Sequence, residues 1–176
     1  MTSVRYLSGF NVLLLSQNAD IISTITNALE PFGYQLQVAP DALAGLDSVM
    51  TNKQDLILAD TSLPPLSGFD LCRSIREEPR LTGIPVLLIS GQAANTEETI
   101  KAFAEGAEHI FFTPIVLEEL RARIRLSLQS AAKIRLANEE RLRLKMMVRK
   151  RTREMEETTM GVVAALEMAN SMNDED

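Results

Sequence analysis

Residues 55–76 read DLILADTSLPPLSGFDLCRSIR. The apolar run Leu56–Ala59 is short and continuous, which is typical of a strand buried on both faces. The Pro64–Pro65 pair that follows marks a turn, because proline has no backbone N–H. From Gly68 to Glu77 the apolar residues recur three and four positions apart, as on an amphipathic helix. The stretch therefore predicts a strand, a turn and a helix, which is one unit of an α/β fold.

The same alternation continues on both sides of this unit. Strands are expected at Asn11–Leu15, Tyr34–Ala39, Asp55–Asp60, Ile84–Ser90 and His109–Phe112. Helices are expected at Asp20–Leu29, Asp41–Thr51, Gly68–Glu77 and Thr96–Glu105. The predicted fold class is α/β, a doubly wound parallel sheet. In such sheets the functional crevice lies beyond the carboxyl ends of the strands.

Composition excludes several classes of protein. Hydrophobic residues make up 45% and charged residues 24% of the 176 residues, which is ordinary for a globular chain. Cys72 is the only cysteine and His109 the only histidine, so we expect neither a disulfide within the chain nor a zinc site. No apolar run approaches the roughly 18 residues that cross a bilayer. These features predict a cytoplasmic protein without a membrane role or a resident metal.

Charge divides the chain into two parts. Six basic and thirteen acidic side chains precede Leu117, whereas twelve basic and eleven acidic ones follow from there onward. An acidic body is a poor general binder of nucleic acid, because neutralisation of phosphates dominates such binding. Residues 141–153 hold seven basic side chains and no acid, but acidic clusters flank them on both sides. We interpret them as partners in ion pairs on a solvated helix and expect no nucleic-acid binding.

The second part is expected to be one long helix. From Val116 to about Met172 there is no proline and one glycine. Steps of three and four residues from Leu117 predict a coiled-coil seam with a polar middle. It includes Ile134, Asn138, Val148, Met155, Val162 and Leu166. A polar-rich helix of this length indicates a partner, and asparagine in a seam favours two strands, so a homodimer is expected. A lone helix folded back onto the sheet is the alternative.

The quoted stretch resembles the central signature of response-regulator receiver domains, the CheY-like phosphoacceptor modules. The segments IPVLLISGQA and GAEHIFFTPI resemble the regions of that family's fourth and fifth strands. The resemblance covers roughly residues 11–128. It implies a flavodoxin-like sheet of five strands in the order 2-1-3-4-5. It also implies a role in two-component signal transduction.

The resemblance assigns roles to particular residues and shows where the pattern is lost. Asp60 matches the phosphoacceptor aspartate, and Ser90 matches the hydroxyl residue that binds a phosphoryl oxygen. The family's acidic pair after the first strand, which helps to hold Mg²⁺, is replaced by Ser16 and Gln17. Two further positions of this degenerate pocket, the phosphate-pairing lysine and the aromatic switch residue, are occupied by Thr113 and Ile110.

These replacements remove charges on which phosphoryl transfer depends. A metal ion and a cation normally neutralise the transferred oxygens, and Mg²⁺ prefers carboxylate oxygens. We therefore expect weak or absent Mg²⁺ binding, no cofactor, and a pseudo-receiver that works without phosphorylation. A working phosphoacceptor is the alternative. Asp60 has a structural interpretation too, as a turn residue that accepts backbone N–H bonds, and hydrogen bonds from Ser16 and Gln17 to Asp60 are expected.

The last forty residues resemble the connector between receivers and HD-GYP cyclic-di-GMP phosphodiesterase domains. No His-Asp metal motif or Gly-Tyr-Pro signature occurs in the chain, so we expect no enzyme activity. The predicted organisation is a receiver at 1–128, a dimerising coiled-coil helix at 129–172, and a disordered tail or the start of an output domain at 173–176. The expected function is relay of a signal, received from a sensor kinase or another partner, to an output domain. A regulatory half of a truncated phosphodiesterase and a free-standing phosphorelay adaptor are the alternatives.

Overall fold

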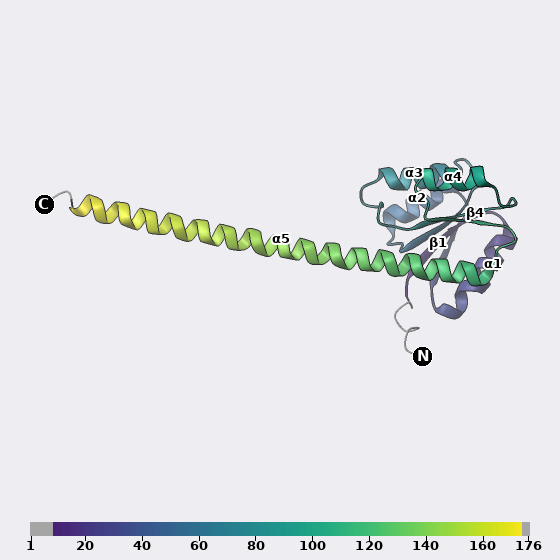
Figure 1. Cartoon of the computed structure of the whole chain (residues 1–176), viewed down its shortest axis with the longest axis horizontal. Coiled ribbons are helices and arrows are strands. Elements are labelled where there is room, and N and C mark those ends of the chain that lie inside the picture. Colours follow the sequence, from purple (N-terminus) through teal and green to yellow (C-terminus); the bar gives the residue numbers. More distant parts are fainter. Residues whose placement is uncertain (1–8, 174–176) are drawn as a thin grey trace. The chain divides into compact units, whose positions relative to one another are not determined.

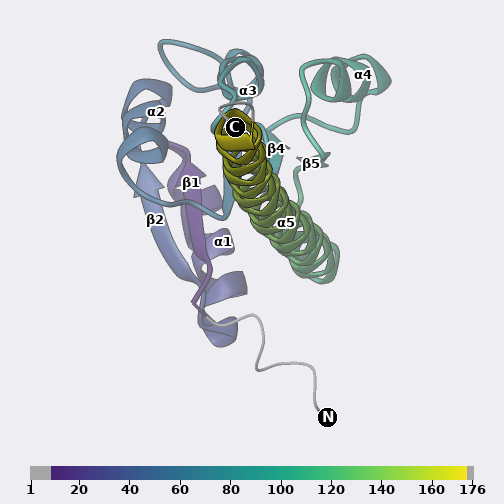
Figure 2. The same ribbon diagram turned by 90° about the vertical axis from the view of Figure 1, so that its left-hand side faces the viewer.

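A computed structural model describes residues 9–173 as five strands and five α-helices with a short 3₁₀ turn. In chain order the elements are β1 (Asn11–Leu15), α1 (Ala19–Leu29), the 3₁₀ turn (Glu30–Phe32), β2 (Gln35–Ala39), α2 (Ala42–Thr51), β3 (Leu56–Asp60), α3 (Gly68–Glu77), β4 (Val86–Ser90), α4 (Thr96–Ala104), β5 (His109–Phe112) and α5 (Leu117–Asn173). All strand pairs are parallel, in the order β2-β1-β3-β4-β5. Figure 2 shows β2 on the left of the sheet and β5 on the right. The predicted fold class and strand order are confirmed.

Helices cover both faces of the sheet (Figure 1). On one face, α1 and the first turns of α5 pack on alternate residues of the central strands, with Ile25, Leu120 and Ile124 in one buried cluster. On the other face, α2, α3 and α4 contribute Val49, Ile75 and Ala102 to a second cluster. Because β1, β3 and β4 lie between these layers, nearly every side chain of these strands is buried. This double burial explains their continuous apolar sequences.

Local chemistry sets the ends of the elements. Asn18 and Asp41 accept backbone N–H bonds from the first turns of α1 and α2, so each helix begins one residue after its cap. β4 begins at Val86, later than predicted, since Pro85 has no N–H to donate to the ladder. Gly33 ends the 3₁₀ turn with a positive φ of 70°, a conformation that glycine adopts without strain.

The contacts divide the chain into two units between Lys133 and Ile134, and α5 contributes to both. In the first unit, Leu120, Ile124 and Leu128 bury the beginning of α5. In the second unit, residues 134–171 are helical and exposed. The predicted boundary at residue 128 and the coiled coil stay predictions. Of the predicted tail at 173–176, Asn173 is the last residue of α5 and the rest lies outside the described residues.

Candidate functional site

Polar residues follow the carboxyl ends of four adjacent strands. Asp60 ends β3 and Ser90 ends β4, while Ser16 directly follows β1 and Thr113 directly follows β5. Hydrogen bonds tie these ends together: the N–H of Thr113 donates to the carbonyl of Ser90 at 3.0 Å, and the N–H of Thr61 donates to the carbonyl of Ile89 at 2.8 Å. The structure therefore brings four of the predicted site positions to one edge of the sheet.

Neutral donors hold both oxygens of the Asp60 carboxylate. The Ser16 hydroxyl donates to Oδ2 at 3.3 Å, and the backbone N–H of Ser62 donates to Oδ1 at 2.9 Å. Asp60 is only 8% exposed and Ser16 only 1%. The predicted Ser16 bond is thus confirmed, and so is the turn role of Asp60.

The hydrogen bond predicted from Gln17 to Asp60 is wrong. Gln17 is exposed, and no hydrogen bond links it to Asp60 in the described part of the chain. The chain turns into the Asn18 cap of α1 just after Ser16, and the side chain of Ser16, the residue before Gln17, is the one that reaches the carboxylate.

Ser90 is turned toward α4. Its buried hydroxyl donates to Oε2 of Glu98 at 2.9 Å and accepts the backbone N–H of Gln92 at 3.2 Å. Sequence reasoning missed Glu98. The only available signal was its place in the first turn of a predicted helix that follows the strand ending in Ser90.

The two remaining predicted positions are not charged. Thr113 is half-buried and brings no ammonium group to the edge of the sheet. Ile110 is almost fully buried in β5 beside Leu88 and belongs to the core cluster under α2, α3 and α4. Ile110 occupies the position of the family's aromatic switch residue. Its aliphatic side chain carries no polar group that could respond to a phosphoryl group bound at Ser90.

Besides Glu98, Gly68 is a residue of the site whose role was not predicted from the sequence. It begins α3, and its N–H donates to the carbonyl of Thr61 at 3.2 Å. A Cβ at this position would collide with the backbone carbonyl of Asp60. Glycine therefore allows α3 to start directly against the end of β3, and the Ser67–Asp70 capping box fixes that start.

The residues present do not fit the Mg²⁺ ion that receivers use. Within residues 9–173 no group of three or more Asp, Glu, His or Cys side chains could hold a metal ion. At Asp60 the oxygens already accept hydrogen bonds, and Ser16 supplies a neutral hydroxyl where the family has a carboxylate, the kind of ligand that Mg²⁺ prefers.

His109 and Cys72 serve the fold. Burial lowers the pKa of His109, and the nearby charge of Arg123 adds to this, although Glu119 opposes it. Its Nε2 lies 3.3 Å from Oε1 of Glu119. Burial raises the pKa of the Cys72 thiol to about 11, so it is an inert core residue.

Comparison with known proteins decides the family. Residues 12–125 match the response regulator receiver domain. The chain belongs to this family. It is 30% identical over 123 residues to the DNA-binding dual master transcriptional regulator RpaA of Synechocystis, covering 70% of this chain and 51% of RpaA. The receiver thus spans about half the length of the curated relatives it matches.

Solved receivers share the fold. The chemotaxis response regulator CheY4 of Vibrio cholerae superposes with a TM-score of 0.63 at 21% identity, covering 68% of this chain and 99% of CheY4. The signal receiver domain of an HD domain-containing protein from Pseudomonas fluorescens gives 0.66 at 23% identity, covering 72% and 92%. In the described residues of this receiver no helix is both long and apolar enough to cross a membrane.

Proposed function

We propose that this receiver regulates by association rather than by phosphoryl transfer. It would dimerise through its C-terminal helix and pass a signal from a sensor kinase or another partner to an output domain. The observation that carries the proposal is the Asp60 carboxylate, which is held by Ser16 and the Ser62 N–H. Neither is a cation or a metal ligand of the kind the reaction requires.

Electrostatics disfavours an aspartyl phosphate at this site. Phosphoryl transfer depends on neutralising charge on the transferred oxygens in the transition state. The positions that would do so carry the neutral side chains of Ser16, Gln17 and Thr113. With Ser90 engaged by Glu98, a phosphoryl group on Asp60 would meet no compensating positive side chain at the matched positions.

Exposed apolar residues on α5 support the dimer. The seam residues Ile134, Val148, Met155, Val162 and Leu166 are each at least 55% exposed. A second helix would remove them from water, and helices of globular proteins gain most of their stability from such packing. Signals would enter by shifting the packing of the junction at residues 117–128 or of the polar middle of the seam.

The test is treatment with a small phosphodonor and Mg²⁺. We expect no phosphoryl adduct at Asp60 by intact-mass measurement and an unchanged dimer in sedimentation. A stable adduct that alters dimerisation would overturn the phosphorylation-independent function and favour the alternative, a phosphorylatable receiver. Truncation after Lys133, where the first unit ends, should abolish the dimer, whereas a persisting dimer would place the interface on the receiver.

The nature of the output belongs to the proposal as well. RpaA is described as DNA-binding, but the match covers the receiver and not the rest of that protein. We propose that residues 9–173 themselves bind no DNA and catalyse no reaction. An HD-GYP output stays a second candidate, supported by the resemblance of the last forty residues to its connector. The Pseudomonas fluorescens receiver shares only the fold and adds no support.

A further inference from the structure

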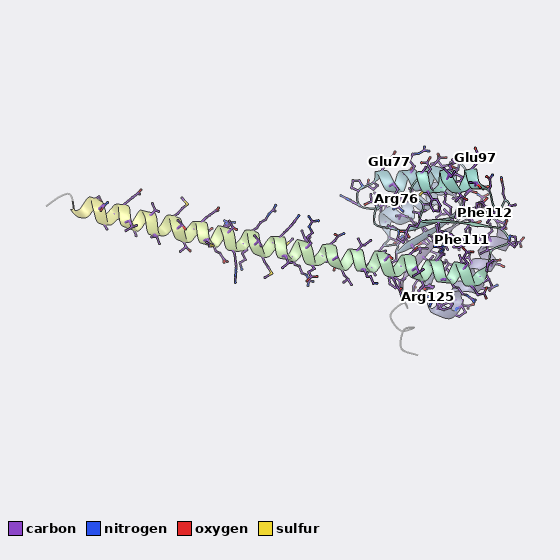
Figure 3. All side chains as sticks on the ribbon, viewed as in Figure 1. Arg76, Glu77, Glu97, Phe111, Phe112 and Arg125 are labelled. Atoms are coloured by element: carbon purple, nitrogen blue, oxygen red, sulfur yellow. The ribbon has the colours of Figure 1, made fainter. Side chains whose placement is uncertain are left out.

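The helix surface around Met155 forms an open groove. It is lined by Arg151, Glu154, Met155, Thr158, Thr159 and Val162. Met155, Thr159 and Val162 are successive seam residues of the heptad repeat, and Met155 is 70% exposed. Side chains of this part of α5 extend around the helix axis, as Figure 3 shows. The groove is therefore where a second helix would pack if the proposed dimer forms.

Some of the described charged side chains beside this groove form ion pairs within the helix, and others do not. Nζ of Lys150 lies 3.8 Å from Oε1 of Glu154, and Nε of Arg153 lies 3.0 Å from Oε1 of Glu157. These pairs are four residues apart and are satisfied along one helix.

Arg151 and Glu156, unlike the residues of those two pairs, do not form ion pairs along the described part of the helix. No ion pair of either residue is found within residues 9–173. Five positions separate them, and five steps of about 100° place them about 140° apart around the helix axis, too far to pair along one helix.

Arg151 and Glu156 occupy the two heptad positions, g and e, that border a coiled-coil seam. Thr152 and Met155 occupy consecutive a and d positions, so Arg151 at g and Glu156 at e flank the seam on opposite sides. In a parallel two-stranded coiled coil, a g residue faces the e residue of the next heptad on the other helix. Between residues 134 and 171 this is the one g–e combination with opposite charges.

We infer that α5 pairs with a second copy in parallel and in register, through two symmetric Arg151–Glu156 ion pairs between the copies. The inference rests on the proposed dimer and adds its orientation and register. Two-fold symmetry makes each pair occur twice. Interhelical pairs at e and g set orientation in coiled coils.

An antiparallel dimer fits the sequence less well. In the antiparallel alignment that sets Thr152 against Met155 of the other helix, the attractive pair would be Arg149 with Glu156. That alignment also sets the amide of Asn138 against the methyl of Ala169. In the parallel dimer Asn138 meets its own copy and can exchange a hydrogen bond with it. Arg141 and Lys145 would also meet their copies, and this repulsion between like charges is a cost that the Asn138 contact and the Arg151–Glu156 pairs must outweigh.

Charge reversal tests the pair in the full chain. Arg151→Glu and Glu156→Arg should each raise the dimer dissociation constant about tenfold, because two attractive pairs become repulsive. The double variant should restore it. Arg149→Glu is the matched control, with an expected change of less than about twofold. Rescue by Arg151→Glu/Glu156→Arg supports the inference, whereas loss of the dimer in Arg149→Glu alone would overturn it in favour of the antiparallel form.

Disulfide trapping provides a readout that is independent of charge. Val148→Cys and Val162→Cys should each cross-link to the same position of the second copy under mild oxidation. Only a parallel, in-register dimer brings both positions to their own copies, because an antiparallel dimer has a single point where like residues meet. The native Cys72 is buried and its raised pKa of about 11 keeps it inert. A dimer in which either position fails to cross-link would overturn the orientation alone, whereas a monomeric parent chain would overturn the proposed dimer itself.

Discussion

The hydroxyl of Ser90 donates a hydrogen bond to Oε2 of Glu98 across 2.9 Å. Ser90 ends β4 with no exposed surface, and Glu98 lies in the first turn of α4. The residue that matches the family's phosphoryl-binding hydroxyl is thus used to fasten α4 to the end of the sheet. This contact gives Ser90 a structural role that needs no phosphate.

Removal of the Glu98 carboxylate should destabilise the receiver. Glu98→Ala leaves the buried Ser90 hydroxyl without its acceptor, which costs about 1–2 kcal/mol in the free energy of unfolding. Glu98→Gln keeps an acceptor oxygen and should cost about half as much or less. Urea unfolding of the three proteins measures both values. Equal stability of Glu98→Ala and the parent chain would show that this bond does not hold α4.

Restoring the lost charges should restore the chemistry. The triple variant Ser16→Asp/Gln17→Asp/Thr113→Lys returns two carboxylates to the positions after β1 and an ammonium group to the position after β5, so Mg²⁺-dependent labelling by a phosphodonor should appear. The matched control adds Asp60→Asn to the triple variant and should abolish the label. Calorimetric titration with Mg²⁺ is the second readout. Labelling of the parent chain to the same extent would contradict the electrostatic argument.

The beginning of α5 should carry much of the stability of the fold. Ile124 is fully buried against β1, β3 and β4, so Ile124→Ala should lower the free energy of unfolding by about 2–4 kcal/mol through lost burial and the cavity left behind. Leu126, two residues along the same helix and 57% exposed, is the control. Leu126→Ala should change stability by less than about 0.5 kcal/mol.

His109 should make the receiver less stable in mild acid. Burial lowers the pKa of its ring in the folded state, with a further contribution from Arg123. The unfolded chain, with a pKa of about 6.5 for this ring, therefore binds the proton first as the pH falls. The contribution of His109 is present above about pH 6.5 and is lost as the pH drops toward the folded value. The free energy of unfolding should decrease between about pH 7.5 and pH 5.5.

Two variants distinguish the contribution of His109 to this pH dependence from the contribution of the carboxylates. His109→Gln removes the titrating ring and should flatten the dependence on pH. Arg123→Gln removes the repelling charge, brings the folded pKa closer to its ordinary value, and should flatten the dependence in part. An unchanged slope in His109→Gln would assign the loss of stability to other groups.

The sequence was enough to predict the layers and most element ends. Buried strands such as Leu56–Asp60 appear as continuous apolar runs, and helices such as Gly68–Glu77 appear as periodic ones, because burial on two faces or one face leaves a direct trace in composition. The strand order came from the resemblance to receivers, since periodicity does not reveal which strands are neighbours. The structure confirms that order.

The candidate site was only partly predictable for a related reason. A contact between Asp60 and Ser16 could be predicted because the two residues lie at the carboxyl ends of the adjacent parallel strands β3 and β1. Gln17 was misassigned, since the turn into the Asn18 cap decides which of two neighbouring side chains faces inward. Glu98 was missed because its contact crosses from a helix to a strand end. The role of Gly68 was missed because only the fold shows that a Cβ at this position would collide with the Asp60 carbonyl.

Fluorine NMR of the receiver with Mg²⁺ and beryllium fluoride measures whether the edge of the sheet at Asp60 can hold a metal ion and a phosphoryl group. This mixture forms a phosphoryl mimic on receivers that can hold the metal and the transferred group. Because the matched positions around Asp60 are neutral, we expect only the signals of free fluoride species, identical in the parent chain and in Asp60→Asn. Bound fluoroberyllate signals that require Mg²⁺ and disappear in Asp60→Asn would contradict it.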